Sequence, residues 1–559
     1  MRAEKPLYGW LDQGNADPLH DKPLAKEMLR QMLGMAELRE VPAQPFAPVS
    51  VPASRLSKAA QAALLEHFGN ERFSIGKLER ARLSLGQSYP DQIRRRSGDV
   101  EHAADAIVQP KSAEECLALL KCASEFRFRV TPVGGGTNVV GAIGEGSDKR
   151  PWVIADFALM NNVINVSVIN QTVEAEAGIL LGDLEKALSA KGLTLGHFPQ
   201  SFHGASLGGS VACNGAGQRS DLYGRLSDNF LSARLATPKG IWKTEPFRHA
   251  AAGPWLGGLV PGAEGMFGLI CSASLRLRKT PEKTEDRAWL FPSFEGGCEA
   301  VRQLAQDGHD LAMLRLSDES ETEFLSQFRL AMAGRARAPM MQRLALWLKR
   351  APARPALLIA GFEGRRVECN ETFNTLAFRL RSAGAVSLGR RPGDSWRKGR
   401  YDLPYLRESL LRLGLGVDTF ETAVPWSEAQ ALRDGVYETV REIVAATLGK
   451  EAGKAAVMCH LSHSYPEGAC LYFTLVFPQS DNPLIQWRVI TSAVMAAVSE
   501  LGGTVSHHHG VGADHAEMAA MDKGPLALVV LKSLKSALDG EGLIASGISA
   551  MTDAAKRAE

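Results

Sequence analysis

The sequence predicts a multi-domain protein of mixed helices and strands, in the α/β or α+β class. A chain of 559 residues corresponds to about four domains of ordinary size, or to two or three large ones. Hydrophobic residues make up 45% and charged residues 23%, which is typical of a globular chain that buries several cores. From residue 98 to 281, short β-branched runs alternate with helical patterns and glycine-rich turns, and this alternation predicts the mixed fold.

The net charge, the cysteines and the absence of targeting signals in the sequence limit the possible partners and cellular locations of the protein. The 64 Lys and Arg residues against 62 Asp and Glu residues leave a net charge of +2, which argues against a nucleic-acid partner, because such partners need a concentrated basic surface. Eight cysteines without a C-x-x-C pair predict reduced, buried thiols. The sequence shows no signal peptide, no apolar run long enough to span a membrane and no S-K-L ending, so we expect a cytoplasmic location.

Residues 1–97 predict a helical N-terminal extension packed on a larger body. Helical patterns at Leu24–Met35 and Ser57–Leu65 are joined by proline-rich connectors. The amphipathic stretch Leu24–Leu38 has two interpretations. It lies on a membrane surface as a peripheral contact, or it packs on the protein body, which is the more ordinary arrangement.

Residues 98–281 predict the first large domain. Strands are expected at Val153-Ile154 and Val163–Val168, and helices at Ser112–Phe126 and Leu181–Lys191.

The rest of the chain predicts a cap domain in two segments. Residues 282–445 combine Arg- and Leu-rich helical sequence with a few strands, and we expect them to form the cap that carries the substrate site. Residues 446–559 are expected to complete the cap and the active site, with strands at 455–476, a helix at 484–501 and a histidine-rich strand end at 504–511.

Glycine is in excess, at 54 of 559 residues, or about 10% against about 7% in average chains. The excess gathers in loops at 134–136, 204–217 and 262–268. Glycine permits positive φ and close backbone approach, so successive N–H groups can converge on a pyrophosphate, although each loop alone is equally well a tight turn. The first loop fits neither the G-x-G-x-x-G nor the G-x-x-x-x-G-K-[ST] pattern, which disfavours a Rossmann or P-loop site. Together the three loops predict a binding surface around one extended ligand.

These loops resemble the FAD-binding PCMH-type domain of the vanillyl-alcohol-oxidase superfamily. The resemblance is carried by Pro132–Asn138, by Pro199-Gln-Ser with Leu207-Gly-Gly209 and Tyr223-Gly224, and by Gly262–Gly268. It implies an α+β fold, with a two-subdomain flavin domain, an α+β cap domain and the helical N-terminal extension.

The resemblance also implies FAD, held without a covalent bond. His197, His203 and Cys213 lie near the loops, but no spacing makes one of them a flavin linker. For His197 and Ser206 a structural role in the turn is the alternative. The implied cofactor-binding residues are Pro132, Val133, Gly134, Gly135, Gly136, Thr137, Asn138, His197, Gln200, Ser201, Ser206, Cys213, Asn214, Gly215, Ala216, Gly262, Ala263, Glu264, Gly265, Met266, Phe267 and Gly268.

Motifs in the second half resemble alkyldihydroxyacetonephosphate (alkylglycerone-phosphate) synthases and their bacterial relatives. They are Leu314–Asp318, Gly393–Arg407, Val417–Trp426, Ser462–Phe473 and Ser506–Gly512. The resemblance implies ether lipid synthesis, in which a fatty alcohol replaces the acyl chain of acyl-dihydroxyacetone phosphate through a flavin N5 adduct. Two alternatives stay open: a flavin oxidase or dehydrogenase of a 2-hydroxy acid or related alcohol, and a flavin-binding scaffold without catalysis. We also expect a homodimer.

Tyr472 is the catalytic tyrosine that the resemblance implies. In a strand it shares a face with Cys470, while Leu471 and Phe473 point the other way. A tyrosine hydroxyl facing the flavin can act as a general acid or base if neighbours lower its pKa from about 10. The structural alternative is a core aromatic with one satisfied hydroxyl. Tyr465 is expected at a turn.

His507, His508 and His509 are further implied catalytic residues, acting in proton transfer and substrate orientation. In an extended strand, His507 and His509 would share a face and His508 would take the other. A structural role is one alternative, and a metal site with His460 and His463 is another. We expect no metal, because the sequence contains no H-E-x-x-H and no acid or thiol at ligand spacing.

Arg407 and Arg315 are the candidates for recognising an anionic group, since a guanidinium binds phosphate or carboxylate through two hydrogen bonds. The resemblance implies that Arg407 contacts substrate and that Arg315 keeps the pocket intact; a solvated helix face is the ordinary alternative. Asp514 and His515 stand where the family carries basic residues, which weakens the phosphate assignment. The expected partner is therefore a small-molecule or lipid substrate with an anionic group.

Overall fold

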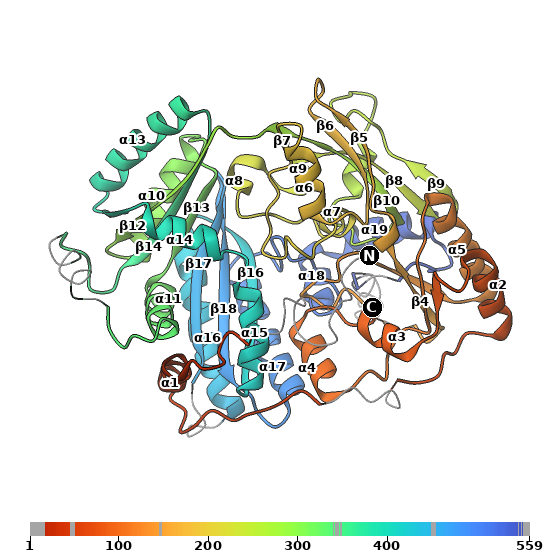
Figure 1. Ribbon diagram of the computed structural model, residues 1–559, viewed down its shortest axis with the longest axis horizontal. Helices are drawn as coiled ribbons and strands as arrows, with labels where there is room; N and C mark the ends of the chain where they lie inside the picture. Colours follow the sequence, from red (N-terminus) through yellow and green to blue (C-terminus); the bar gives the residue numbers. More distant parts are fainter. Residues whose placement is uncertain are drawn as a thin grey trace.

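The computed structural model describes residues 17–44, 51–144, 148–338, 340, 346, 349–448, 454–545, 547–548 and 551. Figure 1 shows an N-terminal half built around two sheets beside a C-terminal half built around one large sheet. Each half has its own large hydrophobic core. This arrangement is the α+β fold that the resemblance implies.

The smaller sheet of the N-terminal half is mostly parallel. Its strands, in spatial order, are β1 (Phe73–Ser74), β2 (Ala106–Val108), β4 (Trp152–Asp156) and β3 (Arg129–Val133). Strands β2, β4 and β3 run parallel and β1 adds an antiparallel edge. Helix α5 (Ala113–Phe126) joins β2 to β3 and begins after Ser112, whose side chain accepts the N–H of Glu115 as a helix cap.

The larger sheet of this half is antiparallel. Its strands, in spatial order, are β5 (Val163–Ser167), β6 (Thr172–Glu176), β10 (Leu269–Arg276), β8 (Phe230–Thr237) and β9 (Gly240–Lys243). The chain between β6 and β8 forms short elements, among which the second glycine loop runs. They are α6 (Leu181–Ser189), β7 (Leu193–Thr194), α7 (Leu207–Ala212), α8 (Ser220–Tyr223) and α9 (Leu226–Asn229).

The C-terminal half is organised by a seven-stranded antiparallel sheet, here called the cap sheet. Its strands, in spatial order, are β15 (Val386–Gly389), β12 (Lys283–Phe291), β14 (Ala356–Gly364), β13 (Met313–Ser317), β17 (Ala456–Ser464), β18 (Gly468–Pro478) and β16 (Leu415–Pro425). The sheet therefore takes strands from both sides of residue 445. This is possible because β17 inserts beside β13 and β18 beside β16.

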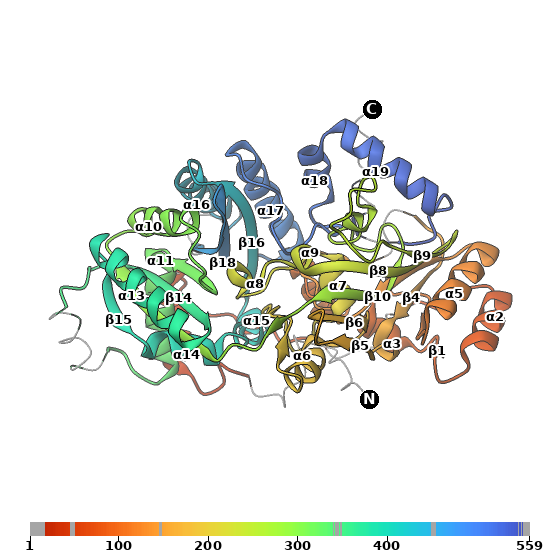
Figure 2. The same ribbon diagram turned by 90° about the horizontal axis from the view of Figure 1, so that it is seen from above.

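Helices cover both faces of the cap sheet (Figure 2). The face that packs into the main core carries α10 (Phe294–Gln306), α13 (Arg366–Ser382), α16 (Ala429–Leu448) and α17 (Pro483–Glu500). The opposite face carries α11 (Glu319–Met332), α14 (Arg391–Gly399) and α15 (Leu403–Arg412), which pack against the sheet in smaller clusters.

The N-terminal segment packs on both halves. Helix α1 (Pro23–Met32) buries Ala25 and Leu29 against the cap, so the amphipathic pattern there reflects packing on the protein body. Helix α2 (Lys58–Phe68) packs into the core of the N-terminal half. Two further helices, α3 (Lys77–Leu83) and α4 (Tyr89–Ser97), complete the segment.

The C-terminal segment returns to the N-terminal half. After α18 (Ala516–Lys523) and α19 (Pro525–Leu538), the chain runs alongside β3. The N–H of Val130 donates to the carbonyl of Leu543 at 2.7 Å, and the N–H of Ala545 donates to the carbonyl of Val130 at 2.9 Å. The end of the chain therefore extends the small sheet as well as following the cap.

One expected strand is absent. Residues 504–511, predicted as a strand end, form an irregular loop in the structure. The strand alternation expected for His507, His508 and His509 is therefore wrong, and side-chain contacts place each ring. In the part of the chain that the structure describes, no helix is long and apolar enough to cross a membrane.

Candidate active site

A cavity of about 1750 Å³ lies between the two halves. The glycine loops of the N-terminal half line one part of it. The cap sheet and helices α11, α14 and α15 line the rest. The sequence-predicted cofactor and substrate regions thus meet in one space.

The first glycine loop packs directly on the second. A Cβ added to Gly134 would lie 2.0 Å from Ser206 Oγ, and one added to Gly135 would lie 2.0 Å from the carbonyl oxygen of Gly204. Gly136 has a φ of +69°, which glycine adopts readily. Larger residues would push the two loops apart, so these glycines are required by the close approach.

The second glycine loop presents two buried polar side chains. Ser206 caps α7 by accepting the N–H of Gly209, and it also accepts the N–H of Gly135. His197 is buried, and within the described residues neither of its ring nitrogens has a hydrogen-bond partner. Burial lowers the pKa of His197 to about 3, so a neutral imidazole with unused hydrogen-bonding atoms lines the cavity. A polar ligand would satisfy those atoms.

Glu264 links the third glycine loop to the histidine segment. Its φ of +47° is unusual for a residue other than glycine. Its carboxyl group accepts the N–H groups of Val511 and Gly512. Burial raises the pKa of Glu264 to about 7. The loop that ends the cofactor region therefore also positions the chain just after the histidines.

Most of the predicted cofactor-binding residues line the cavity, and their contact with a cofactor stays a prediction. Those that line it are Pro132 to Asn138, His197, Gln200, Ser201, Ser206, Cys213, Gly215, Ala216, Glu264 and Gly265. The others lie behind the lining: Asn214 accepts the N–H of Ser227, Met266 and Phe267 pack in the cap core, and Gly262, Ala263 and Gly268 complete the turn. Ala545 also lines the cavity and was missed, because its contact depends on the return of the C-terminal segment.

Tyr472 faces the cavity from the middle of β18. Leu471 and Phe473 point into the core on the other side, as strand alternation predicts. The Tyr472 ring stacks on His460, with centroids 4.8 Å apart, and meets His509 edge-on at 5.4 Å. Burial raises the pKa of Tyr472, contrary to the lowering that we considered for a general base. Its hydroxyl therefore stays protonated and can donate a hydrogen bond.

Arg315 supports Tyr472 through a chain of contacts. Its guanidinium lies 3.0 Å from Glu321 Oε1, which lies 2.9 Å from His460 Nδ1. Burial alone would raise the pKa of Glu321, but Arg315 and His460 outweigh it and lower that pKa. An ionised Glu321 thus fixes the ring against which Tyr472 stacks. Sequence reasoning missed Glu321, because no motif marks it.

Arg407 lines the cavity with its guanidinium only partly engaged. Nη1 donates to the carbonyl of Gln87 at 2.6 Å, and Nη2 lies 3.8 Å from Asp418 Oδ1. Its Nε is buried with no hydrogen-bond partner in the described part of the chain. Burial, with Asp91 and Asp418 nearby, raises the pKa of Asp514 to about 7, so this side chain becomes negatively charged only near neutral pH.

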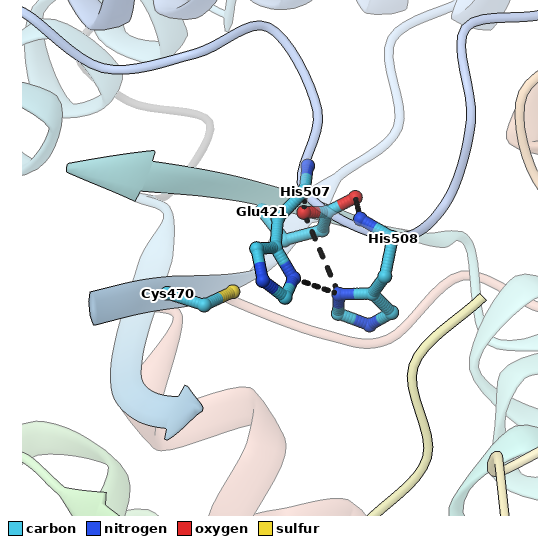
Figure 3. Close-up of side chains that lie close together, drawn as sticks. All are labelled: Glu421, Cys470, His507 and His508. Carbon is cyan, nitrogen blue, oxygen red and sulfur yellow. Dashed lines mark hydrogen bonds and ion pairs between the residues drawn. The ribbon is translucent and has the colours of Figure 1, made fainter. Parts of the chain in front are cut away.

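Glu421 holds the histidine loop in place (Figure 3). This buried carboxylate on β16 accepts the backbone N–H groups of His507, His508 and His509. It also accepts the hydroxyl of Ser506 at 2.8 Å. His508 and His509 line the cavity, whereas His507 lies behind them. Glu421 belongs to a motif noted in the sequence, but its role as an anchor needs the structure.

A group with metal-ligand chemistry forms at the same place. Glu421, Cys470, His507 and His508 bring one potential ligand atom each to within 4.8 Å of one another. The expectation that no acid or thiol lies at ligand spacing from the histidines is therefore wrong, because strands β16 and β18 bring Glu421 and Cys470 close to them. The bonds that Glu421 makes to the loop backbone account for its position.

Comparisons with known proteins agree with this geometry. Residues 104–244 match the family model described as an FAD binding domain, and residues 280–548 match that of the C-terminal domain of FAD linked oxidases. The chain is 33% identical over 470 residues to an alkyldihydroxyacetonephosphate synthase of Dictyostelium discoideum and 30% identical over 470 residues to one of Trypanosoma brucei brucei. Each match covers 83% of this chain and 76% of the relative. A solved alkyldihydroxyacetonephosphate synthase superposes with a TM-score of 0.80 at 29% identity, covering 93% of this chain and 92% of the other.

Proposed function

The chain belongs to the FAD-dependent alkyldihydroxyacetonephosphate synthase family, and we propose that it exchanges the acyl chain of acyl-dihydroxyacetone phosphate for a fatty alcohol. In this exchange the bond between the acyloxy oxygen and the dihydroxyacetone carbon breaks, and the fatty acid leaves with both of its oxygens and ionises to a carboxylate in water. The alcohol oxygen forms the new ether bond and its hydroxyl proton is released. No net oxidation or reduction occurs.

The observation that carries the proposal is the apolar part of the cavity. Beyond Tyr472 and the histidines, the lining continues with apolar side chains from α11, α15 and the cap sheet. They include Phe324, Phe328, Met332, Leu406, Leu410, Met458 and Val476. A long hydrocarbon chain gains free energy by leaving water for such a surface, at about 0.8 kcal/mol per CH₂ group. A small 2-hydroxy acid has no hydrocarbon chain to bury against this apolar surface.

FAD would be held by the glycine loops at the other end of the cavity. The close approach of Gly134 and Gly135 to the second loop leaves no room for side chains, so that a pyrophosphate can lie close to the backbone of the first loop, and His197 offers ring nitrogens without a partner among the described residues. Bound there, FAD supplies an electron-accepting ring system. Attachment is proposed to be non-covalent, since desolvation raises the pKa of the half-buried Cys213 thiol to about 12, so that little thiolate is available.

The remaining roles follow from position in the cavity. Arg407 is proposed to bind the phosphate, because its guanidinium retains an unpaired Nε. Tyr472 is proposed to donate its hydroxyl hydrogen to a substrate oxygen, since burial keeps it protonated. His508 and His509 are proposed to take and return protons. Arg315 positions His460 and Tyr472 through Glu321.

An exchange assay tests the proposal. Purified FAD-loaded protein, given acyl-dihydroxyacetone phosphate and an isotope-labelled fatty alcohol, is expected to form labelled ether lipid and one equivalent of fatty acid. Arg407→Lys keeps the charge but loses the forked geometry, and we expect its KM for the phosphate substrate to rise more than tenfold. Arg366→Lys, on the exposed surface of α13, is the matched control. Absence of labelled ether product would contradict the proposal.

We also propose that the cavity mouth contacts an anionic membrane surface. Arg329, Arg335, Lys349 and Arg391 are exposed and line the cavity, so they mark its opening, and Leu403 beside them is 47% exposed. Basic side chains near anionic lipid contribute about 1 kcal/mol each. Sedimentation with vesicles rich in phosphatidylserine is expected to retain the protein, and Arg335→Glu is expected to weaken retention. Equal retention on neutral vesicles would contradict this.

The homodimer expected from the sequence stays a prediction. Sedimentation velocity of the FAD-loaded protein tests it, with a species near twice the 60.3 kDa chain mass expected.

A further inference from the structure

A continuous hydrogen-bonded row runs from the turn between β17 and β18 to the cavity. It is made of Tyr465, His507 and His508. The Tyr465 hydroxyl lies 2.7 Å from His507 Nε2. His507 Nδ1 lies 3.0 Å from His508 Nδ1, as Figure 3 shows. His508 in turn lines the cavity. Both links are within normal hydrogen-bond distance.

The outer end of the row lies in a turn whose next residues are exposed. Tyr465 stands in the turn between β17 and β18, half-buried, and is followed by the exposed residues Pro466 and Glu467. Its backbone is fixed, because its N–H donates to Gly468 and its carbonyl accepts the indole N–H of Trp426 at 2.9 Å. The hydroxyl is thus held at one point beside His507, next to the exposed part of the turn.

The middle of the row is also held rigidly. Glu421 binds the backbone N–H of His507, and the guanidinium of Arg225 donates to the His507 carbonyl. The ring of His463 stacks on that of His507 with centroids 5.2 Å apart. His507 is 5% exposed, so water does not reach it freely. Its ring is therefore placed to pass a proton between two fixed neighbours.

We propose that Tyr465, His507 and His508 form a proton relay that connects the cavity to solvent. The inference rests on the proposed function, in which the alcohol loses its hydroxyl proton inside the cavity. His508 Nε2 accepts that proton while its Nδ1 proton moves to His507 Nδ1. The His507 Nε2 proton moves to the Tyr465 oxygen, and Tyr465 releases its own proton to water. Passage in the opposite direction restores the starting tautomers: Tyr465 takes a proton from water, and His508 Nε2 gives its proton to the leaving fatty acid, which ionises after it reaches water.

The relay fits the electrostatics of the site. Burial lowers the pKa of both His507 and His508 well below the usual value, so neither ring readily carries an extra proton. A concerted shift needs no stored charge, because each ring gains one proton as it gives up another. Tyr465 is needed as the outer member because His507 is only 5% exposed.

Tyr465→Phe tests the relay by removing one oxygen and keeping the ring. We expect the exchange rate to fall roughly 100-fold, in the range for loss of a proton-transfer group, with FAD affinity and KM unchanged. The dependence of rate on the deuterium fraction of the solvent should be curved in the wild type, because several protons move together, and linear in the variant. Tyr437→Phe is the matched control, because its hydroxyl binds Asp318 and it does not line the cavity.

A double variant tests whether the residues act as one unit. His507→Gln is expected to cost about as much as Tyr465→Phe, and the double variant no more than either. A wild-type rate or an unchanged solvent dependence in Tyr465→Phe overturns the relay. Losses that add up in the double variant also overturn the relay. So does the finding that the purified protein contains one equivalent of zinc and that Cys470→Ser removes this zinc. If the wild type itself catalyses no exchange, the proposed function fails instead.

Discussion

Replacing Glu421 by glutamine should release the histidine loop. One carboxylate oxygen accepts the Ser506 hydroxyl and the N–H groups of His508 and His509, and the other accepts the N–H of His507. In the best orientation of Glu421→Gln, the amide oxygen keeps the first three donors. The amide NH₂ then faces the N–H of His507, so that hydrogen bond is lost.

The magnitude follows from the number and charge of these bonds. A hydrogen bond to a charged group contributes about 1.5–3 kcal/mol, and a neutral one about 0.5–1.5 kcal/mol. Losing one bond costs about 1.5–3 kcal/mol and neutralising three costs about 1–1.5 kcal/mol each, so the local stability falls by roughly 4.5–7.5 kcal/mol. At about 1.4 kcal/mol per factor of ten, opening of the loop becomes at least roughly 1,000-fold more frequent.

Amide hydrogen exchange of residues 504–512, followed by mass spectrometry, measures that opening. We expect exchange in this peptide to accelerate by at least 100-fold, and turnover to fall because His508 and His509 lose their fixed positions. Glu442→Gln, on the exposed side of α16, is the matched control and should leave the peptide unchanged. Acceleration of less than tenfold in Glu421→Gln would refute the anchoring role.

Three further predictions concern the first glycine loop, Tyr472 and the buried Asp221, which accepts the backbone N–H groups of Leu314 and Ser464. Gly135→Ala places a methyl group 2.0 Å from the carbonyl oxygen of Gly204, so we expect the purified variant to lose most of its flavin absorbance, whereas a yellow variant of normal FAD content would contradict the close packing. Tyr472→Phe should abolish turnover with FAD still bound; an active variant would remove its assigned role. Burial raises the pKa of Asp221 to about 7 from 3.8, so the folded protein holds a proton that the unfolded chain releases, and stability falls as pH rises from about 4 to about 7. Asp221→Asn should therefore lose less Tm between pH 5 and pH 8 than the wild type, and an equal loss would contradict the assignment.

Local patterns in the sequence were sufficient for most helices and strands. The helix expected at Ser112–Phe126 is α5, the helix expected at 484–501 is α17, and the face of Tyr472 followed from strand alternation. These features depend on neighbours along the chain. The expected strand at 504–511 failed because a distant carboxylate, Glu421, takes the backbone N–H groups that a strand would pair.

The site was predictable only where motifs carry it. The glycine loops can be recognised from their composition. The two arginines and the three histidines can be recognised from the motifs in which they lie. The roles of Glu321 and Glu421 could not be found in this way, because each depends on a partner more than 80 residues away in the sequence. Glu321 contacts His460, although it also contacts the nearby Arg315, and Glu421 contacts His507. The proposed relay role of Tyr465 could not be predicted from the sequence, because its position in a turn was already a sufficient explanation for a tyrosine there.

We propose that this protein exchanges an acyl chain for an alcohol without net redox chemistry. The most direct measurement adds a 2-hydroxy acid, and separately acyl-dihydroxyacetone phosphate with a labelled fatty alcohol, to the FAD-loaded protein without oxygen. We predict that the flavin stays oxidised with the hydroxy acid and that labelled ether lipid forms with the second mixture. Rapid bleaching of the flavin by the hydroxy acid, with no ether product, would contradict the claim and identify an oxidoreductase.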